Sequence, residues 1–298
     1  PPRPPPKGPP VITLKGVLKT YSSEVAIGPV DLEIPEGGIT ALVGANGAGK
    51  STLLTMIGRL LGMDAGAIEI AGYDVATTKS GDLAKIVSIL RQENHFITRL
   101  TVRQLVGFGR YPHSKGRLTP HDEEKISQAI DFLDLGGLEG RYLDQLSGGQ
   151  RQRAYVAMVL AQDTEYVLLD EPLNNLDVSH SHAMLQTLRR AADELGKTVV
   201  IVVHDINYAS CWADQIVAMK DGGIVAIGTP SEIVRQELLA EVFDLDIEVT
   251  EYRGRRIAHF YLPVPVCEHC HKQPGKGCCL DGSPVSPGPV PLTLGRPA

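Results

Sequence analysis

The chain has 298 residues, of which 43% are hydrophobic and 21% charged, so it can bury a substantial core. Its 29 Lys and Arg against 35 Asp and Glu give a formal net charge of -6, which argues against a nucleic-acid partner because no overall basic field exists. No apolar run approaches the roughly 20 residues that cross a bilayer, so we expect no pore within this chain. The Pro-rich opening lacks the apolar stretch of a secretory signal, which predicts a cytoplasmic location.

Composition also predicts the domain organisation. Residues 1–10 and 263–298 are rich in Pro and Gly and show no helix or strand period, so we expect a disordered N-terminal extension and a flexible tail. Folded structure is expected over residues 11–262. Within that range Cys211 is the single cysteine, which argues against a fold held by disulfides.

The expected elements change in character along the chain. Residues 12–70 alternate strand-like runs with turns, whereas residues 100–160 are mostly helical. Three apolar runs, at residues 39–43, 167–169 and 199–203, predict strands buried on both faces, as in a parallel sheet. The sequence therefore predicts an α/β fold in which a mixed sheet core carries a helical insertion.

Helical periodicity and turn signals add structural detail. Two helical segments carry an apolar stripe that we expect in the core: Ile126, Ala129, Ile130 and Leu133 in one, and Leu185, Leu188, Ala192 and Leu195 in the other. Residues 229–232 form a capping box with Pro at the first helical position, after a hairpin that turns at residues 221–223. We interpret these features as packing and chain reversal rather than as binding surfaces.

A phosphate-binding loop is predicted between the first buried strand and a helix. The pattern G-x-x-x-x-G-K-S is matched by Gly44, Ala45, Asn46, Gly47, Ala48, Gly49, Lys50 and Ser51, and Thr52 follows in the helix. Glycines let backbone amides face the phosphates, while Lys50 neutralises the terminal phosphates and Ser51 is a ligand for Mg²⁺. The alternative, a chance match in a Gly-rich turn, is disfavoured by the flanking strand and helix. The sequence thus predicts a site for ATP and Mg²⁺.

Two carboxylates end the next buried strand. Asp170 can hold Mg²⁺ directly or through water, and Glu171 can orient and deprotonate an attacking water. Taken alone, such a pair is equally consistent with a helix cap or a solvated turn. Together with the phosphate loop, it predicts ATP hydrolysis with Lys50 and Glu171 as catalytic residues.

A second anion site is predicted at Ser147, Gly148, Gly149 and Gln150, where a helix begins and its free amides attract negative charge. This segment resembles the signature motif of the ATP-binding-cassette (ABC) family. The resemblance implies the P-loop NTPase fold of ABC ATPases, with an antiparallel β subdomain and a helical signature subdomain at about residues 95–160. It also implies that two copies associate head to tail and sandwich two ATP molecules, because one chain cannot fold its signature onto its own phosphate loop.

Further positions match the family pattern in chain order. By resemblance, Tyr21 stacks on adenine, Gln92 senses the nucleotide and the partner and joins the Mg²⁺ ligands, and Asp177 crosses the dimer. His204 is expected to contact the γ-phosphate and to hold Glu171 and the water in line. Considered singly, Tyr21 is an exposed strand aromatic, Gln92 a loop amide and His204 a structural histidine. Only the ordered occurrence of the family positions favours the functional interpretation.

Two segments, Leu100 to Leu118 and Leu238 to Leu262, resemble cassette subunits of bacterial importers for ferric siderophores, haem and cobalamin. The resemblance implies an ATP-hydrolysing subunit of a ferric-siderophore importer, peripheral on the cytoplasmic face of the membrane. Its expected partners are permease subunits that dock near Gln92 and an extracytoplasmic binding protein. Haem or cobalamin import stays open as an alternative, as does a soluble ABC ATPase that serves iron-sulfur assembly, ribosomes or chromosomes.

The tail carries a separate candidate metal site. Cys267, Cys270, Cys278 and Cys279 supply enough thiolates for one tetrahedral Zn²⁺, and the first pair has C-x-x-C spacing. Against this, the second pair is adjacent and no hydrophobic shell is evident. The alternative is a flexible extension without metal.

Overall fold

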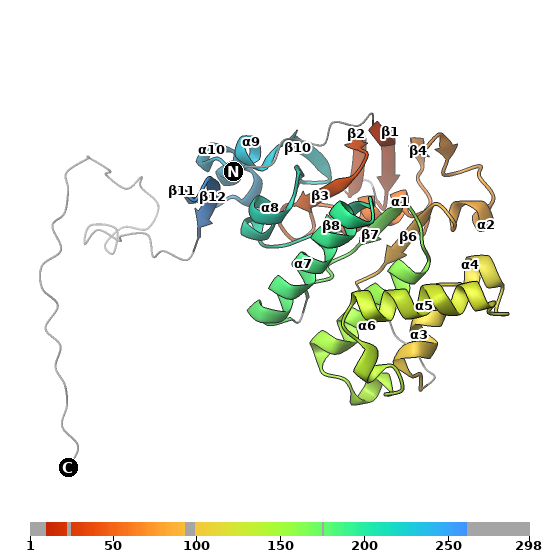
Figure 1. Cartoon of the computed structure of the whole chain (residues 1–298). Helices are drawn as coiled ribbons and strands as arrows, with labels where there is room; N and C mark the ends of the chain where they lie inside the picture. The colour runs from red at the N-terminus through yellow and green to blue at the C-terminus, as the bar shows by residue number, and fades with distance from the viewer. Residues whose placement is uncertain (1–9, 23–24, 93–98, 175, 261–298) are drawn as a thin grey trace, which may run out of the picture. The chain divides into compact units, whose positions relative to one another are not determined.

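A six-stranded sheet forms the centre of the computed structural model, which describes residues 10–22, 25–92, 99–174 and 176–260 (Figure 1). Its order is β10–β9–β3–β8–β7–β6. These strands are β3 (Gly38–Val43), β6 (Val87–Leu90), β7 (Tyr166–Leu169), β8 (Thr198–Val202), β9 (Gln215–Lys220) and β10 (Gly223–Gly228). Neighbours pair in parallel except β9 and β10, which form an antiparallel hairpin. The predicted mixed sheet and its three buried strands, β3, β7 and β8, are confirmed.

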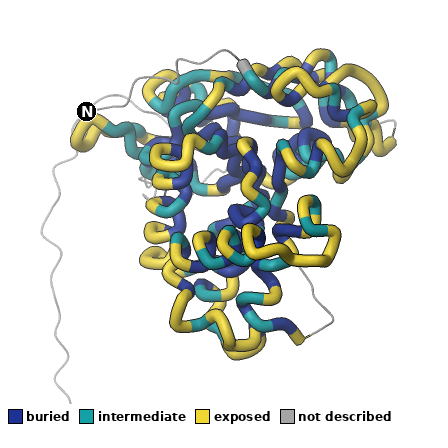
Figure 2. The backbone as a smooth tube through the Cα atoms, turned by 45° about the vertical axis from the view of Figure 1, so that its right-hand side comes forward, coloured by how far each residue is buried: buried dark blue, intermediate teal, exposed yellow. Residues whose placement is uncertain are grey.

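Both faces of this sheet are buried along its inner strands, as the apolar runs predict. Because successive side chains of a strand point to opposite faces, Ile39 and Val43 of β3 join one core cluster and Leu42 joins the other. The first cluster lies against the helices on one side of the sheet. The second lies against α1 (Lys50–Ile57) and a four-stranded antiparallel sheet. Figure 2 accordingly shows buried segments, in dark blue, gathered in the middle of the folded part of the chain.

The antiparallel sheet has the order β2–β1–β4–β5. Its strands are β1 (Pro10–Thr20), β2 (Ala26–Pro35), β4 (Ala65–Ile70) and β5 (Tyr73–Asp74). It corresponds to the early part of the chain, where strand-like runs alternate with turns. The antiparallel β region implied by the family resemblance is therefore present.

Residues 102–161 form a helical region, which we call the helical insertion. It consists of α3 (Val102–Phe108), α4 (Tyr111–Ser114), α5 (Pro120–Phe132), η1 (Gly136–Leu138), η2 (Leu143–Gln145) and α6 (Gly148–Ala161). In Figure 1 these helices lie together beside the sheet, and α6 leads directly to β7. The predicted stripe from Ile126 to Leu133 is buried, as expected.

A buried ion pair fastens this helical insertion. Arg110 Nε donates to Asp122 Oδ1 at 2.9 Å, and only 3% and 4% of the two side chains are exposed. Arg110 Nη1 also donates to the Ala161 carbonyl at 2.8 Å. The carboxylate of Asp122 in turn accepts the backbone N–H of Thr119 at 2.9 Å, at the start of α5. These contacts connect α5 to the end of α6.

The remaining elements follow the sheet strands. They are α2 (Ser80–Leu83), α7 (Val178–Glu194), α8 (Ile206–Trp212), α9 (Pro230–Ile233), α10 (Gln236–Phe243), β11 (Glu248–Tyr252) and β12 (Arg255–His259). The predicted capping box is present, since the Glu232 carboxylate accepts the Thr229 backbone N–H at 2.7 Å. No helix among the described residues is long and apolar enough to cross a bilayer.

One predicted core position is wrong. Leu185, Leu188 and Ala192 are buried on α7, but Leu195 is 48% exposed. The helix ends at Glu194 and Leu195 is its C-cap, so the helical period no longer applies there. Its side chain therefore leaves the stripe.

Candidate nucleotide-binding site

The phosphate loop lies where the sequence predicts it, between β3 and α1. Gly44, Gly47 and Gly49 have φ angles of 149°, 84° and 95°, a region that glycine enters without strain. A Cβ on Gly44 would lie 2.1 Å from the Met219 carbonyl, and one on Gly49 would lie 2.6 Å from Ile27 Cδ1. The backbone conformation therefore favours glycine at both ends of the loop, and at Gly44 the Met219 backbone also leaves no room for a Cβ.

Lys50 is the first residue of α1 and is buried under the loop. Its Nζ donates to the carbonyls of Gly44 at 3.0 Å and Ala45 at 2.9 Å. Burial lowers the pKa of Lys50, while the nearby carboxylates of Glu171 and Asp170 oppose that change. A phosphate is a stronger acceptor for this ammonium than two backbone carbonyls, so the arrangement fits an anionic ligand.

Ser51 and Asp170 form a pair that fits Mg²⁺. The Ser51 hydroxyl donates to Asp170 Oδ1 at 2.7 Å, and Asp170 is only 5% exposed at the end of β7. Burial raises the pKa of Asp170, and the Ser51 hydrogen bond offsets part of the effect. Carboxylate and hydroxyl oxygens are the hard ligands that Mg²⁺ prefers, and the cation would relieve the desolvation of this carboxylate.

The side chain of Glu171 is held at both oxygens. His204 Nε2 lies 2.7 Å from Oε1, while Gln92 Nε2 donates to Oε2 at 2.6 Å. Asn174 Nδ2 also reaches Oε2, at 3.4 Å. The backbone of Glu171 has φ of 49°, a left-handed conformation that costs a non-glycine residue about 1–3 kcal/mol and is typical of functional sites. The structure thus brings together three predicted residues and adds Asn174, which our sequence analysis missed.

The order of the strands explains why these residues meet. The strands β3, β8, β7 and β6 are consecutive parallel neighbours, so their carboxyl ends lie along one edge of the sheet. The phosphate loop follows β3, His204 follows β8, Glu171 follows β7 and Gln92 follows β6. Ligand sites of α/β sheets form at this edge. Topology therefore assembles the site from segments far apart in the chain.

The predicted second anion site lies at the start of α6. Ser147 is the N-cap, its hydroxyl accepts the Gln150 backbone N–H at 3.2 Å, and the Gln150 side chain accepts the Ser147 N–H at 3.0 Å. Ser147 and Gly148 are exposed, whereas Gly149 is buried. The capping box thereby fixes the conformation of the turn, and Ser147 and Gly148 face solvent.

The other predicted residues come from β1, α1 and α7. Tyr21 is 55% exposed near the end of β1, and Thr52 lies in the first turn of α1. Asp177 caps α7 and accepts the His180 backbone N–H at 2.8 Å. The four cysteines of the tail, Cys267, Cys270, Cys278 and Cys279, lie outside the described residues.

Comparison with known proteins identifies the family. The family model described as "ABC transporter" matches residues 27–174. Petrobactin import ATP-binding protein FatE of Bacillus anthracis is 63% identical over 239 residues, which cover 80% of this chain and 96% of that protein. This chain belongs to the ABC transporter family. The predicted family is confirmed.

Further similarities place the chain more closely within the ABC family. Petrobactin import ATP-binding protein YclP of Bacillus subtilis strain 168 is 47% identical over 251 residues, covering 84% of this chain and all of that protein. A solved dimeric, post-hydrolysis structure of the ATP-binding cassette MJ0796 with ADP and Pi has a TM-score of 0.65 at 30% identity, covering 73% of this chain and 98% of that chain. As an ABC transporter ATP-binding protein, this chain is an ATPase coupled to transport, and it binds ATP and Mg²⁺.

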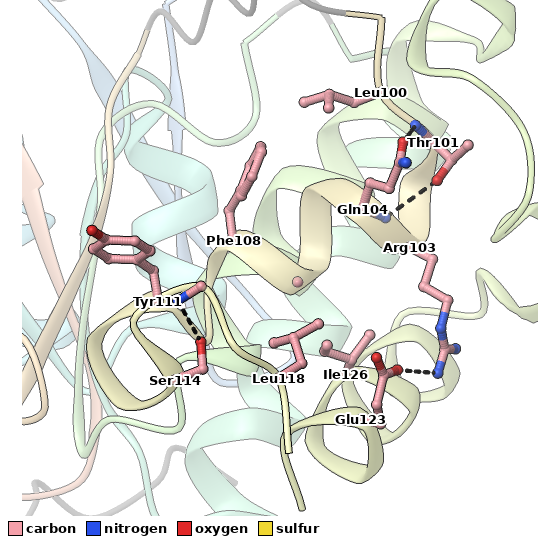
Figure 3. A pocket seen from close by; sticks show the side chains of 12 residues that line it. Leu100, Thr101, Arg103, Gln104, Phe108, Tyr111, Ser114, Leu118, Glu123 and Ile126 are labelled. Carbon is pink, nitrogen blue, oxygen red and sulfur yellow. Dashed lines mark hydrogen bonds and ion pairs between the residues drawn. The ribbon is translucent and has the colours of Figure 1, made fainter. Parts of the chain in front are cut away.

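This ABC protein also has a groove on its helical insertion, with a volume of about 570 Å³. The lining residues are Leu100, Thr101, Arg103, Gln104, Gly107, Phe108, Tyr111, Ser114, Gly116, Leu118, Glu123 and Ile126. Figure 3 shows that its aromatic side chains come from the end of α3 and the start of α4. Phe108, Tyr111 and Leu118 are 49%, 63% and 44% exposed. At one end, Arg103 Nη2 donates to Glu123 at 2.8 Å. The groove thus offers an apolar floor with one charged end.

Proposed function

We propose that this chain is the ATP-hydrolysing subunit of an importer for ferric siderophores of the petrobactin class. The observation that carries the proposal is the 63% identity to a protein named for petrobactin import, along nearly the full length of that relative. The complete set of strand-end residues, including Glu171, supports an active rather than a degenerate cassette. Peripheral attachment to the cytoplasmic face of the membrane belongs to the same proposal.

The proposed chemistry assigns one task to each side chain. Lys50 binds the terminal phosphates, and Ser51 and Asp170 hold Mg²⁺, which supplies positive charge to the phosphate oxygens when bound. Glu171 accepts the proton of the attacking water, and His204 holds that carboxylate in line. Gln92 is the further Mg²⁺ ligand of this proposal.

Access to the Glu171 base depends on its present hydrogen bonds. His204 occupies Oε1, and Gln92 occupies Oε2. Each oxygen accepts more than one hydrogen bond, so an attacking water reaches Oε2 most freely when the Gln92 amide moves away. Since Gln92 lies beyond β6, next to the segment that leads to the helical insertion, docking of a partner there can release the base. This contact would couple hydrolysis to the presence of a permease.

The proposed assembly contains two copies of this chain. The exposed Ser147 and Gly148 of one copy would face the phosphates held by the other, and Asp177 would lie at the same interface. Tyr21 would stack on adenine, a role that its exposure allows. Closure of this dimer on ATP would move the docked permease between its inward-facing and outward-facing states.

The groove on the helical insertion is the proposed docking place for the permease. Its exposed aromatic and aliphatic side chains suit the apolar face of a short cytoplasmic helix, and the Arg103–Glu123 end suits polar groups at one end of that helix. The described residues contain no helix able to cross a membrane, so a transporter that uses this ATPase needs such a partner.

The proposal is tested by assembling the full chain with the permease genes next to its own and with their binding protein. ATP hydrolysis is then measured with the binding protein empty, or loaded with ferric petrobactin, another ferric siderophore, haem or cobalamin. We expect the strongest stimulation by ferric petrobactin. Stimulation by haem or cobalamin alone would reassign the substrate, and hydrolysis indifferent to the permease would favour the soluble ABC ATPase.

Zinc binding by the tail stays a separate prediction. It is tested by measuring zinc content and ATPase activity of the full chain and of a truncation after Pro265. Zinc that co-purifies with the full chain alone supports the site. Equal activity and no zinc uptake by either form would contradict it.

A further inference from the structure

Gly149 in the signature turn is buried against the first turn of α7. A Cβ at this position would lie 2.5 Å from Cδ2 and 2.9 Å from Cγ of His180 in the same chain. Gly149 does not have a positive φ angle, unlike the glycines of the phosphate loop, and it is the second residue of α6. Its backbone conformation therefore suits any residue. What requires glycine here is space, and the His180 ring fills that space.

The His180 ring is itself held in a defined orientation. Asp177 Oδ1 accepts two hydrogen bonds at 2.8 Å, one from the His180 backbone N–H and one from Nδ1 of the ring. The backbone hydrogen bond has the larger effect and the ring hydrogen bond the smaller, and both lower the pKa of Asp177, so its carboxylate stays ionised. The imidazole is thereby fixed on the N-terminal turn of α7, with its Cδ2 edge toward Gly149.

We propose that His180 is a positioning residue for ATP hydrolysis, which sets the signature turn of its own chain through the contact with Gly149. Asp177, His180 and Gly149 then form one unit that connects the chain segment after Glu171 to the start of α6. This inference rests on the proposed dimer, in which the signature turn acts on the ATP of the other copy. A shift of the Asp177 segment would reach the signature turn through a packed ring rather than through flexible chain.

The contact predicts a specific consequence of adding one methyl group. Gly149→Ala forces either the His180 ring or the first turn of α6 to move, because overpacking of a close contact displaces its neighbours. Ser147 and the free amides of the turn move with α6. Misplacement of a catalytic group by about 1 Å costs about 100-fold in rate.

The experiment compares Gly149→Ala, His180→Ala and the double variant, each in the full chain assembled with its permease. We expect Gly149→Ala to lower kcat by about 100-fold. Affinity of the isolated full chain for an ATP analogue should change far less than kcat, because the phosphate loop of the same chain is untouched. Adding His180→Ala should restore kcat to that of His180→Ala alone, since the smaller side chain makes room for the methyl group.

A matched control uses His182, another exposed histidine of α7. Its ring contacts Trp212, at 5.3 Å between ring centroids, instead of Gly149. His182→Ala should therefore leave the Gly149→Ala defect unchanged. Thermal unfolding of every variant shows whether folding and activity are lost and restored together.

Two results would overturn the inference. The double variant could remain inactive, which would mean that the nucleotide itself requires glycine at position 149. If Gly149→Ala misfolds and the double variant misfolds as well, the inference is likewise contradicted. Wild-type activity of Gly149→Ala would mean that the contact does not set the turn. If the wild-type assembly neither hydrolyses ATP nor transports, the proposed function fails instead, while recovery of the unfolding temperature in the double variant still reports on the contact.

Discussion

The strand-end site and the helical insertion are assembled by different means. Lys50 is placed by a loop whose conformation its own glycines determine, and Asp170, Glu171 and His204 are placed by parallel strands that end at one edge. The helical insertion is instead fastened by side-chain contacts between its own segments, such as the buried Arg110–Asp122 pair. The comparison indicates that sheet topology brings the residues of the strand-end site together, whereas side-chain packing holds the helical insertion in shape.

The two regions also differ in how they tolerate charge. Burial raises the pKa of Asp170 and lowers that of Lys50. The strand-end site therefore suits a cation beside Asp170 and an anion beside Lys50, because each would stabilise the charged form of the buried side chain. In the helical insertion Asp122 is already compensated, by Thr119 and Arg110. Substitutions in the strand-end site should therefore reduce catalysis, whereas substitutions of the buried ion pair in the helical insertion should reduce stability.

The largest expected effect on catalysis is that of Glu171→Gln. Loss of the general base should lower kcat by about 100- to 10,000-fold, while the thermal unfolding temperature stays near that of the wild type. ATP should then accumulate in a closed dimer, detected as an ATP-dependent increase in mass by size-exclusion chromatography with light scattering. Normal hydrolysis by this variant would contradict the assignment of the base.

The largest expected effect on stability is that of Asp122→Ala. It leaves Arg110 buried without its charge partner, which should reduce the free energy of unfolding by about 3–5 kcal/mol. The matched control is Glu123→Ala, at the next position of α5, because Glu123 pairs with Arg103 at an exposed site. That variant should cost less than about 1 kcal/mol. Equal losses in denaturant unfolding would remove the distinction between the two pairs.

A smaller effect is expected from Phe108→Asp in the groove. A charge on the apolar floor should weaken permease co-purification and permease-stimulated hydrolysis by about tenfold, the effect of losing one anchoring side chain. Tyr73→Asp is the matched control, because Tyr73 is similarly exposed, 48% against 49%, but lies on β5. Similar losses for both variants would show that the groove is not the docking place.

The smallest effect is a pH dependence of stability. Hydrogen bonds from Thr119, then Arg110, hold the pKa of Asp122 at about 2, below its unfolded value of about 4. Since the folded state binds this proton less strongly, the contribution is present above about pH 4 and is lost as the pH falls toward about 2. Asp122→Asn should flatten that part of the unfolding-versus-pH curve, and an unchanged slope would contradict the assignment.

Sequence analysis predicted the features that a short spacing encodes. The phosphate loop, the strand that ends in Asp170 and the start of α6 each depend on a few consecutive residues. The parallel strands were predictable because burial on both faces demands uninterrupted apolar runs. Family resemblance then linked these motifs in the right order.

The sequence did not reveal contacts that depend on how elements approach one another. Asn174 could be suspected only from its position three residues after Glu171, and no periodicity places His180 beside Gly149. The exposure of Leu195 depends on where α7 ends, which hydrophobic spacing alone does not determine. These contacts arise from tertiary packing and therefore needed the structure.

The most direct test of the central claim is uptake by liposomes that contain the full chain, its permease and its binding protein. ATP is supplied on the side of the liposome membrane to which this chain is attached. Uptake of labelled ferric petrobactin and release of phosphate are measured together. We predict ATP-dependent uptake that Glu171→Gln abolishes. Phosphate release without uptake, unaffected by the permease or the ferric siderophore, would contradict the account.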